Sequence, residues 1–269
     1  MHEIDRLLKE KEKRLQPLMN HIIPGRIVEF GCGSGFVLEI LTKNFINSTI
    51  IGVDKSITRL KVIKENLKNV IPVQADITQS IFRNNTFDTA LFVDSLHEVF
   101  SLSRKKFEDA LQMSYNTLKD NGVLIIHESL RPPSELVDLT FKTEESRTKF
   151  LKFAREFRPR KVEYKETKQG VTLDIADALD FLSKYLCPPE EWGEEMGETH
   201  FFFTEEEYHE AAQKAGFTIK ESRKLKRYKK RMTTHTDIEY TFKVKYPWIQ
   251  LVLLKKVENS SHFTLNSKE

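Results

Sequence analysis

The sequence contains little cysteine and no long apolar run, and each absence excludes a class of protein. Its two cysteines, Cys32 and Cys187, fit neither a metal-binding spacing nor a disulfide framework, which favours the reducing cytosol. No stretch approaches the roughly eighteen apolar residues of a membrane-spanning helix. The charged N-terminus, MHEIDRLLKEKEKRL, lacks the apolar segment of a signal peptide. We therefore expect a cytoplasmic protein without a membrane partner.

Charge of one sign is also scarce. The formal net charge is +3 at pH 7, with 39% hydrophobic and 31% charged residues. These proportions are ordinary for a folded soluble chain, and so small a net charge identifies no partner by itself. A chain of 269 residues can bury one large core, or form one domain with a substantial insertion.

Apolar segments with strand and helix periodicity alternate along most of the chain. An amphipathic helix within residues 1–24 comes first, and Pro24 and Gly25 end it. Such alternation predicts an α/β fold, with a doubly wound, seven-stranded, mostly parallel sheet and helices on both faces. The predicted strands lie at 27–30, 48–54, 70–76, 87–95 and 123–129, with a sixth from Phe217 and a seventh at 248–256.

The alternation stops between the fifth and sixth strands. Residues 132–203 contain two segments with helical character and many aromatic side chains. We expect them to form a helical cap insertion over the substrate, and the aromatics to line either that pocket or the insertion's own core. Residues 25–131 and 204–257 would then form the main domain, with a frayed polar tail at 258–269.

A glycine-rich turn follows the first strand, in IVEFGCGSGFVLEI. Gly31, Gly33 and Gly35 at alternate positions cost conformational entropy unless the backbone or a ligand requires them. The pattern departs from the dinucleotide motif G-x-G-x-x-G, because Phe36 stands in the place of its last glycine. A ligand at such a sheet lies beyond the carboxyl ends of the strands. The turn therefore predicts either close backbone approach to a ligand or a tight turn without one.

Acidic residues end three successive strands. Asp54 stands at the position where a carboxylate accepts hydrogen bonds from both ribose hydroxyls, and it would repel a 2′-phosphate. Glu29 and Asp76 add negative charge, which attracts a ligand that carries positive charge. The site therefore suits an adenosine-like ligand without a pyrophosphate.

Five segments in order resemble the motifs of class I S-adenosylmethionine-dependent methyltransferases, a Rossmann-like family. They are VEFGCGSG, IIGVDKS, VQADI, FDTALFVDSLHEV and LKDNGVLIIHE, and they cover roughly residues 25–130. The resemblance implies that the cofactor is S-adenosyl-L-methionine, with its methionine part near Glu29 and the glycine turn and its ribose on Asp54. Asp76 and Ile77 would hold the adenine. The implied cofactor-binding residues are Glu29, Gly31, Cys32, Gly33, Gly35, Asp54, Lys55, Ala75, Asp76, Ile77, Asp94 and Ser95.

The resemblance also implies that the reactive methyl group lies near the end of the fourth strand. His97 is the candidate catalytic residue there, because an ordinary histidine exchanges protons near neutral pH. Alternatively, His97 only shapes the loop, since methyl transfer often needs little beyond positioning and desolvation. Histidine and carboxylate side chains at the neighbouring strand ends could form a metal shell, but we favour a polar rim without metal. These side chains are Asp94, His97, His127 and Glu128.

Two features point to different acceptors. The insertion brings acidic and aromatic residues toward the expected pocket, which favours a small-molecule or metabolite-like acceptor. Seven of the nine residues in the run Arg223–Arg231 are basic, so an RNA or protein methyltransferase that uses this run is the alternative. A non-catalytic S-adenosylmethionine-binding protein is the third hypothesis. The insertion residues expected over the pocket are Trp192, Glu195, Glu198 and His200.

Overall fold

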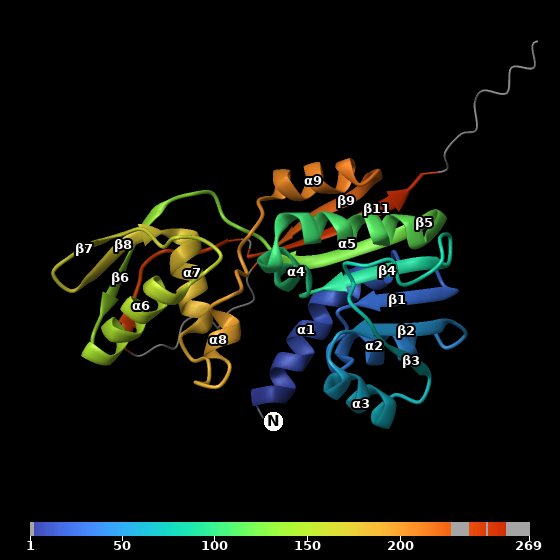
Figure 1. The fold of residues 1–269 in the computed structure, drawn as a ribbon, viewed down its shortest axis with the longest axis horizontal. Coiled ribbons are helices and arrows are strands. Elements are labelled where there is room, and N and C mark those ends of the chain that lie inside the picture. The colour runs from blue at the N-terminus through green and yellow to red at the C-terminus, as the bar shows by residue number, and fades with distance from the viewer. Residues whose placement is uncertain (1–2, 227–236, 246, 257–269) are drawn as a thin grey trace, which may run out of the picture.

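The computed structural model describes residues 3–226, 237–245 and 247–256. Seven strands form one sheet in the order β3-β2-β1-β4-β5-β11-β9, in which β11 is antiparallel to both its neighbours (Figure 1). This arrangement confirms the doubly wound, mostly parallel sheet. We call this part the sheet lobe. Its elements are α1 (Glu3–Met19), β1 (Arg26–Phe30), α2 (Phe36–Asn44), β2 (Thr49–Asp54), α3 (Ile57–Asn66), β3 (Val70–Gln74), β4 (Phe87–Val93), α4 (Leu96–Leu102), α5 (Arg104–Thr117), β5 (Leu118–Ser129), α9 (Glu205–Lys214), β9 (Phe217–Leu225) and β11 (Trp248–Lys255).

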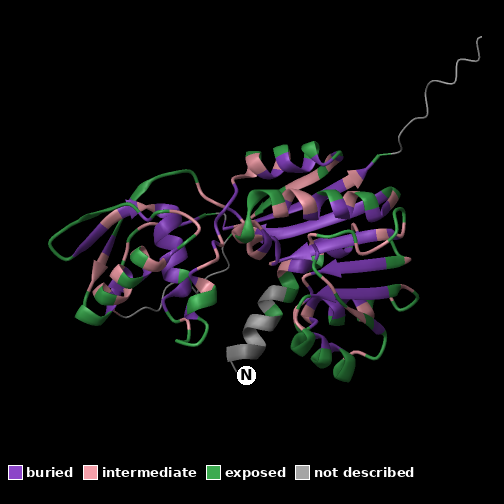
Figure 2. Cartoon of the chain, viewed as in Figure 1, coloured by how far each residue is buried: buried purple, intermediate pink, exposed green. Residues whose placement is uncertain are grey.

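Helices cover both faces of this sheet. Helices α4, α5 and α9 pack on one face, where Phe92, Phe107 and Tyr208 share a core. Helices α1, α2 and α3 pack on the other face, where Leu38 and Leu91 are fully buried. Most residues of the central strands are buried, as the burial colours of Figure 2 show. A parallel sheet covered on both faces requires such near-continuous apolar strands.

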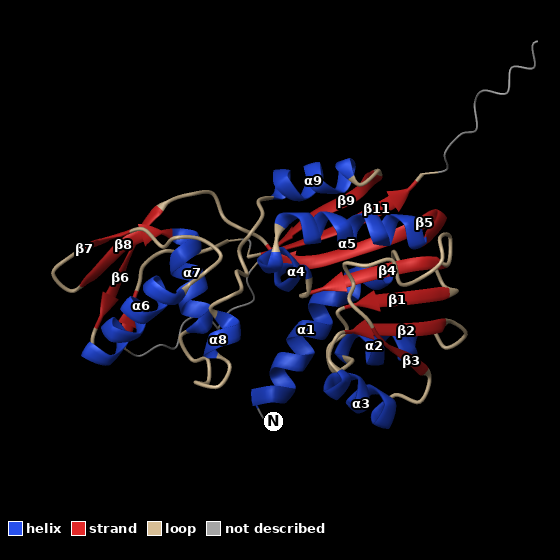
Figure 3. Ribbon diagram, in the orientation of Figure 1, coloured by secondary structure: helices blue, strands red, loops and turns tan. Residues whose placement is uncertain are grey.

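Residues 132–203, together with β10 from a later part of the chain, form a second lobe with a sheet of its own. This four-stranded antiparallel sheet has the order β10-β6-β8-β7, and three helices accompany it (Figure 3). We call residues 132–203 and 237–245 together the cap. Its elements are β6 (Leu136–Phe141), α6 (Glu144–Glu156), β7 (Tyr164–Glu166), β8 (Gly170–Asp174), α7 (Ile175–Lys184), α8 (Trp192–Glu195) and β10 (Ile238–Glu239).

The prediction of a helical insertion was wrong for these strands. Each segment expected to be helical begins as a strand, with β6 ahead of α6 and β8 ahead of α7. Val137 and Leu139 are buried while the residues between and before them are exposed. Such alternation with a period of two is typical of a strand. It extends over only six residues, so the longer helical pattern that follows led to the prediction of a helix for the whole segment.

The predicted boundary of the main domain also needs correction, because residues 237–245, between β9 and β11, belong to the cap. Ile238 pairs with Phe141 in the cap sheet, and Lys142 N donates to Asp237 O at 2.8 Å. Val244 is buried in the same lobe. The expected continuous segment 204–257 is therefore interrupted by residues that complete the cap. The expected tail 258–269 lies outside the described residues.

Most of the insertion's aromatic side chains form the core of the cap. This core supports the interpretation in which the aromatics pack with one another rather than line a pocket. Phe202 and Phe203 instead join the sheet lobe, against Phe100 and Phe107. The aromatics buried in the cap core are Phe150, Phe153, Phe157, Phe181, Tyr185, Trp192 and Phe201.

Candidate active site

The glycine turn leaves an opening at the carboxyl edge of the sheet. Gly33 has a φ of +53°, and a Cβ atom added there would meet nothing within 4 Å. Its backbone N–H donates to Asp54 Oδ2 at 2.8 Å. A side chain at Gly33 would therefore enter open space, and the left-handed backbone would strain any L-residue.

Gly31 has a different role in the same turn. A Cβ atom at Gly31 would lie 2.6 Å from Ser95 Cβ. Ser95 Oγ donates to Phe30 O at 3.0 Å, which holds the start of α4 against the end of β1. Gly31 N and Cys32 N both donate to Val53 O, at 2.8 and 3.0 Å. Gly31 therefore permits close packing, whereas Gly33 faces open space.

Carboxylates surround this opening. Asp54 is 4% exposed, and its Oδ1 also accepts from Ser56 N at 2.8 Å. Glu29 is buried at the end of β1. Hydrogen bonds from Thr78 N and Thr78 Oγ1 outweigh burial and lower the pKa of Asp76, with smaller contributions from nearby lysines. The edge therefore presents negative charge to a ligand at neutral pH.

A cavity follows this edge from the glycine turn to α4. Seven of the expected cofactor residues line it, namely Gly31, Asp54, Lys55, Ala75, Asp76, Ile77 and Ser95. Five further lining residues were not expected, namely Arg59, Thr78, Glu98, Val99 and Leu102. Helix α4 was missed because only two residues separate its seven residues from β4, although Leu96, Val99 and Phe100 have helical spacing.

The other expected cofactor residues lie beside or behind the cavity. Cys32 is buried, and burial with the charges of Glu29 and Asp54 raises the pKa of its thiol, so the thiol stays neutral. A Cβ atom on Gly35 would meet Ile63 at 2.9 Å. Asp94 ends β4 with a φ of 51°. These residues shape the turn and the strand end rather than the cavity wall.

His97 stands at the start of α4 beside a buried glutamate. Its Nδ1 lies 3.1 Å from Glu128 Oε2, and Glu128 Oε1 accepts from Leu96 N at 2.8 Å. Burial lowers the pKa of His97, but the carboxylate of Glu128 outweighs it and raises the pKa to about 9. Glu128 therefore favours the protonated imidazole, so His97 suits a hydrogen-bond donor better than a general base.

The cap reaches His97 through the segment that returns to the sheet lobe. The rings of His97 and His200 meet edge to face, with centroids 4.8 Å apart. Glu198 joins them, and one ligating atom from each of the three lies within 4.8 Å of the others. Burial, with the charges of Lys184 and His97, lowers the pKa of His200 to about 4. Burial and then Glu98 raise the pKa of Glu198.

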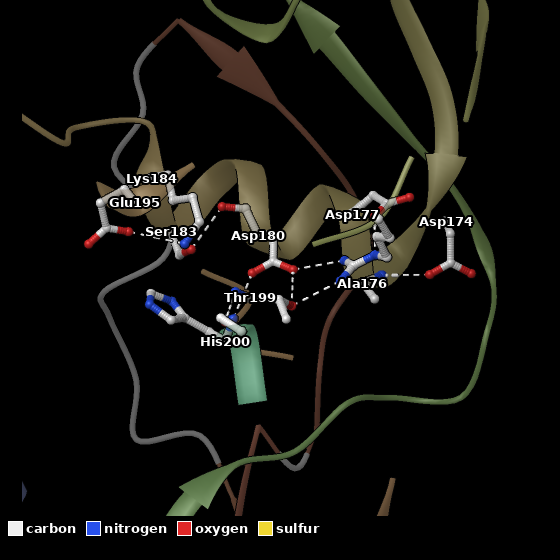
Figure 4. Close-up of polar contacts among 11 residues, drawn as sticks. Asp174, Ala176, Asp177, Asp180, Ser183, Lys184, Glu195, Thr199 and His200 are labelled. Carbon is white, nitrogen blue, oxygen red and sulfur yellow. Dashed lines mark hydrogen bonds and ion pairs between the residues drawn. The ribbon is translucent and has the colours of Figure 1, made fainter. Parts of the chain in front are cut away.

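A buried polar network fixes this cap segment. His200 N donates to Asp180 Oδ1 at 3.0 Å, and Thr199 Oγ1 donates to Asp180 Oδ2 at 2.8 Å (Figure 4). Arg160 donates to Asp180 at 2.7 Å and to Asp177 at 2.6 Å. The network therefore ties the position of His200 to α7, which carries both aspartates.

The residues weighed for a metal shell divide into two pairs. His127 is fully buried, with its Nδ1 3.3 Å from Gln250 Nε2 and its Nε2 3.8 Å from Asp94 Oδ1. His97 contacts Glu128 instead. The grouping that the structure forms among the described residues is His97 with Glu198 and His200.

Trp192, Glu195 and the described part of the basic run are engaged in other contacts. Trp192 is buried in the cap core and its Nε1 donates to Glu156 at 2.8 Å, while Glu195 pairs with Lys184 at 3.0 Å. Arg223 and Lys224 lie on β9, the strand at the far edge of the sheet from β3, and both pair with glutamates. Residues 227–231 of the run lie outside the described residues. Among the helices described, none is both long and apolar enough to cross a bilayer.

Three comparisons agree with this architecture. A family model described as a methyltransferase domain matches residues 1–222. Trans-aconitate 2-methyltransferase of Acidovorax ebreus is 34% identical over 85 residues, which are 29% of this chain and 33% of that relative. The matched segment thus spans about a third of the relative's length.

Two solved structures are similar in fold. An S-adenosylmethionine-dependent methyltransferase of Methanosarcina mazei has a TM-score of 0.56 and 17% identity, over 90% of this chain and 97% of that one. The 1,6-didemethyltoxoflavin-N1-methyltransferase of Burkholderia thailandensis, solved with S-adenosylhomocysteine, has a TM-score of 0.50 and 12% identity, over 93% and 78%. The opening at Gly33 and the acids at the strand ends fit such a cofactor. The chain therefore belongs to the methyltransferase domain family.

Proposed function

We propose that the protein methylates a small, polar acceptor between the cavity at the glycine turn and the cap. The observation that carries this proposal is the contact of His200 with His97, rings 4.8 Å apart. It puts the cap over the end of β4, beside the cavity that runs along the strand ends. S-adenosylmethionine supplies a methyl group on a positively charged sulfur, and its transfer to the acceptor leaves a neutral thioether.

The cofactor residues are proposed from the cavity and its charges. Asp54, fixed by the N–H groups of Gly33 and Ser56, would accept hydrogen bonds from the ribose hydroxyls. Asp76 and Ile77 would hold the adenine, and Glu29 would balance the positive charge of the methionine part. Because Asp54 is already hydrogen-bonded in place, little ordering remains to be done on binding.

His97 would act on the acceptor by charge and hydrogen bonding. Glu128 fixes its ring through Nδ1, so Nε2 is left to face an acceptor oxygen or nitrogen. Direct displacement needs the acceptor in line with the methyl group and shielded from water. The cap, through Glu198 and His200, would provide that shielding.

Two observations favour a small acceptor over a nucleic acid. The cap segment 198–200 contacts His97 directly, which narrows the approach to the reaction edge. Arg223 and Lys224 of the basic run are already paired with Glu221 and Glu205. The relatives named above for trans-aconitate and 1,6-didemethyltoxoflavin act on small molecules by name, which supports this acceptor class.

The test is the transfer of isotope-labelled methyl groups into a cell extract separated into small molecules, RNA and protein. We expect label in the small-molecule fraction, and none with the Gly33→Val variant. Label in RNA that is lost at high salt would reject the small-molecule acceptor and support a nucleic-acid acceptor. A chain that binds S-adenosylmethionine but labels no fraction would favour the non-catalytic hypothesis.

A further inference from the structure

We propose that His97, Glu198 and His200 form a binding site for a first-row divalent metal ion, best exemplified by Zn²⁺, where the cap meets the sheet lobe. The site differs from the set of strand-end residues weighed from the sequence, since two of its three ligands come from the cap. Its existence is independent of the proposed function, and only its role toward the acceptor rests on that function.

The ligand set and its spacing suit such an ion. One ligating atom from each residue lies within 4.8 Å of the others. Ligands about 2.1 Å from a tetrahedral zinc ion lie about 3.4 Å apart, so small side-chain rotations close the remaining distance. Two histidines and one carboxylate hold zinc in catalytic sites that keep a fourth position open. Imidazole ligands favour zinc and its first-row neighbours over magnesium or calcium.

The histidine on the sheet lobe is already oriented for this role. Glu128 takes Nδ1 of His97 at 3.1 Å, which leaves Nε2 to bind the ion in place of its proton, and that proton is released to solvent on metal binding. Glu128 is itself fully buried and accepts from Leu96 N at 2.8 Å. A carboxylate on the other ring nitrogen fixes the tautomer and strengthens the ligand in metal-binding histidines.

The two ligands from the cap are held relative to His97 by a separate chain of hydrogen bonds. Thr199 N, between them, donates to Ser101 Oγ at 3.0 Å, and Ser101 Oγ donates to His97 O at 2.8 Å. On the other side Asp180 accepts from His200 N at 3.0 Å (Figure 4). The cap segment is therefore fixed both to α7 and to the helix that carries His97.

The charges around the cluster favour a divalent cation. Glu98 and Glu128 both interact electrostatically with His97, and Glu98 also lines the cofactor cavity. Lys184 opposes a cation near His200, but it is paired with Glu195 at 3.0 Å. An ion bound here would lie beside the cavity, with an open position for an oxygen or nitrogen atom of the acceptor. It would also bridge the two lobes.

Metal titration of the full chain tests the site. The protein is stripped with a chelator and titrated with Zn²⁺ by calorimetry and with Co²⁺ by visible absorption. We expect one ion per chain, and more than tenfold weaker binding in His200→Ala and in Glu198→Gln. Matched controls are His209→Ala on α9 and the exposed Glu194→Gln on α8, which should bind as the wild type does. Glu128→Gln should weaken binding by about 10–100-fold, as the loss of an orienting partner does.

The outcomes separate this proposal from the proposed function. A stripped wild-type chain that takes up neither Zn²⁺ nor Co²⁺ at micromolar concentrations would overturn the site, whatever the variants do. Unchanged binding in Glu198→Gln and His200→Ala, with melting temperatures near that of the wild type, would overturn it as well. Metal binding together with no methyl transfer into any fraction would retain the site and reject the acceptor proposal.

Discussion

The two lobes would contribute opposite halves of the proposed site, and they are stabilised in different ways. The sheet lobe buries its central parallel strands under helices on both faces, and its cavity lies at the strand ends. The cap is a thin antiparallel sheet with an aromatic core and a buried ionic network around Arg160. They meet through a few contacts near His97. This difference implies that cofactor binding and acceptor binding can be perturbed separately.

The largest expected effect comes from the ionic network of the cap. Arg160→Ala leaves Asp177 and Asp180 buried without their cation, and breaking such a pair costs about 3–5 kcal/mol. We expect about 3 kcal/mol here, because the Arg160 side chain is 32% exposed. The cap should lose stability, whereas the sheet lobe should keep its own and its affinity for S-adenosylmethionine.

The two tryptophans make this measurable, since Trp192 lies in the cap and Trp248 on β11. Urea unfolding is followed by fluorescence in Trp248→Phe and Trp192→Phe backgrounds, one reporter for each lobe. Arg155→Ala is the control, because Arg155 is 71% exposed in its pair with Glu156 and such pairs contribute about 0–1 kcal/mol. Equal destabilisation at both reporters would mean that the lobes unfold as one unit.

The next effect belongs to the sheet lobe alone. Gly33→Val places a side chain in the opening before Asp54 and at a φ of +53°, so S-adenosylmethionine affinity should fall by at least about a hundredfold, roughly 2.7 kcal/mol. Gly193→Val in the cap is the matched control, because a Cβ atom there also meets nothing within 4 Å and its φ is ordinary. Calorimetry measures both. Wild-type affinity in Gly33→Val would remove the glycine turn from the binding site.

How far the sequence predicts each lobe follows from the same difference. Strands buried on both faces, such as β4, are mostly apolar, so their number and their succession along the chain could be predicted. The strand-end rule then located Asp54 and Asp76 at the cavity. In the cap, all three residues of β7 are exposed, and β6 has only two buried residues to distinguish it from the helix that follows.

The acceptor half of the site depends on tertiary contacts that no local pattern contains. His200 was expected near the pocket because of the acidic and aromatic residues around it, but its pairing with His97 requires the return of the cap chain to α4. Trp192, expected beside it from the same segment, faces the cap core instead. Val99 and Leu102 also line the cavity, but they lie on the short helix α4. A search confined to the ends of the strands therefore could not find them.

A third substitution tests the junction between the lobes. His97→Ala should lower kcat by about a hundredfold, a typical effect of losing one positioned hydrogen-bond donor at the reacting atoms, with S-adenosylmethionine affinity near that of the wild type. The reason is that His97 contacts the cap and Glu128 but does not line the cofactor cavity. Single-turnover methyl transfer and calorimetry give the two values, with His209→Ala as the control. Weaker S-adenosylmethionine binding at an unchanged kcat would mean that His97 contacts the cofactor rather than the acceptor.

The smallest expected effect concerns a charge that stabilises only the sheet lobe. Burial would raise the pKa of Asp88, but the hydrogen bond from Arg26 N and the pair with Lys119 outweigh burial and lower it. A carboxyl group whose pKa is lower in the folded state stabilises the fold at pH values above its unfolded pKa of about 3.9. This stabilisation disappears as the pH falls through the pKa of the folded state. Asp88→Asn should therefore lower the free energy of unfolding by about 1 kcal/mol at pH 7, and the difference from the wild type should shrink steadily below pH ~4.

Urea unfolding with Trp248 as reporter measures this difference at both pH values. The control is Asp120→Asn, at an exposed position, which should change the free energy of unfolding little at either pH. If the loss of stability stays the same in acid, the shape of Asp88 and not its charge stabilises the sheet lobe. If the Trp192 reporter also shows a loss of stability, the two lobes unfold together.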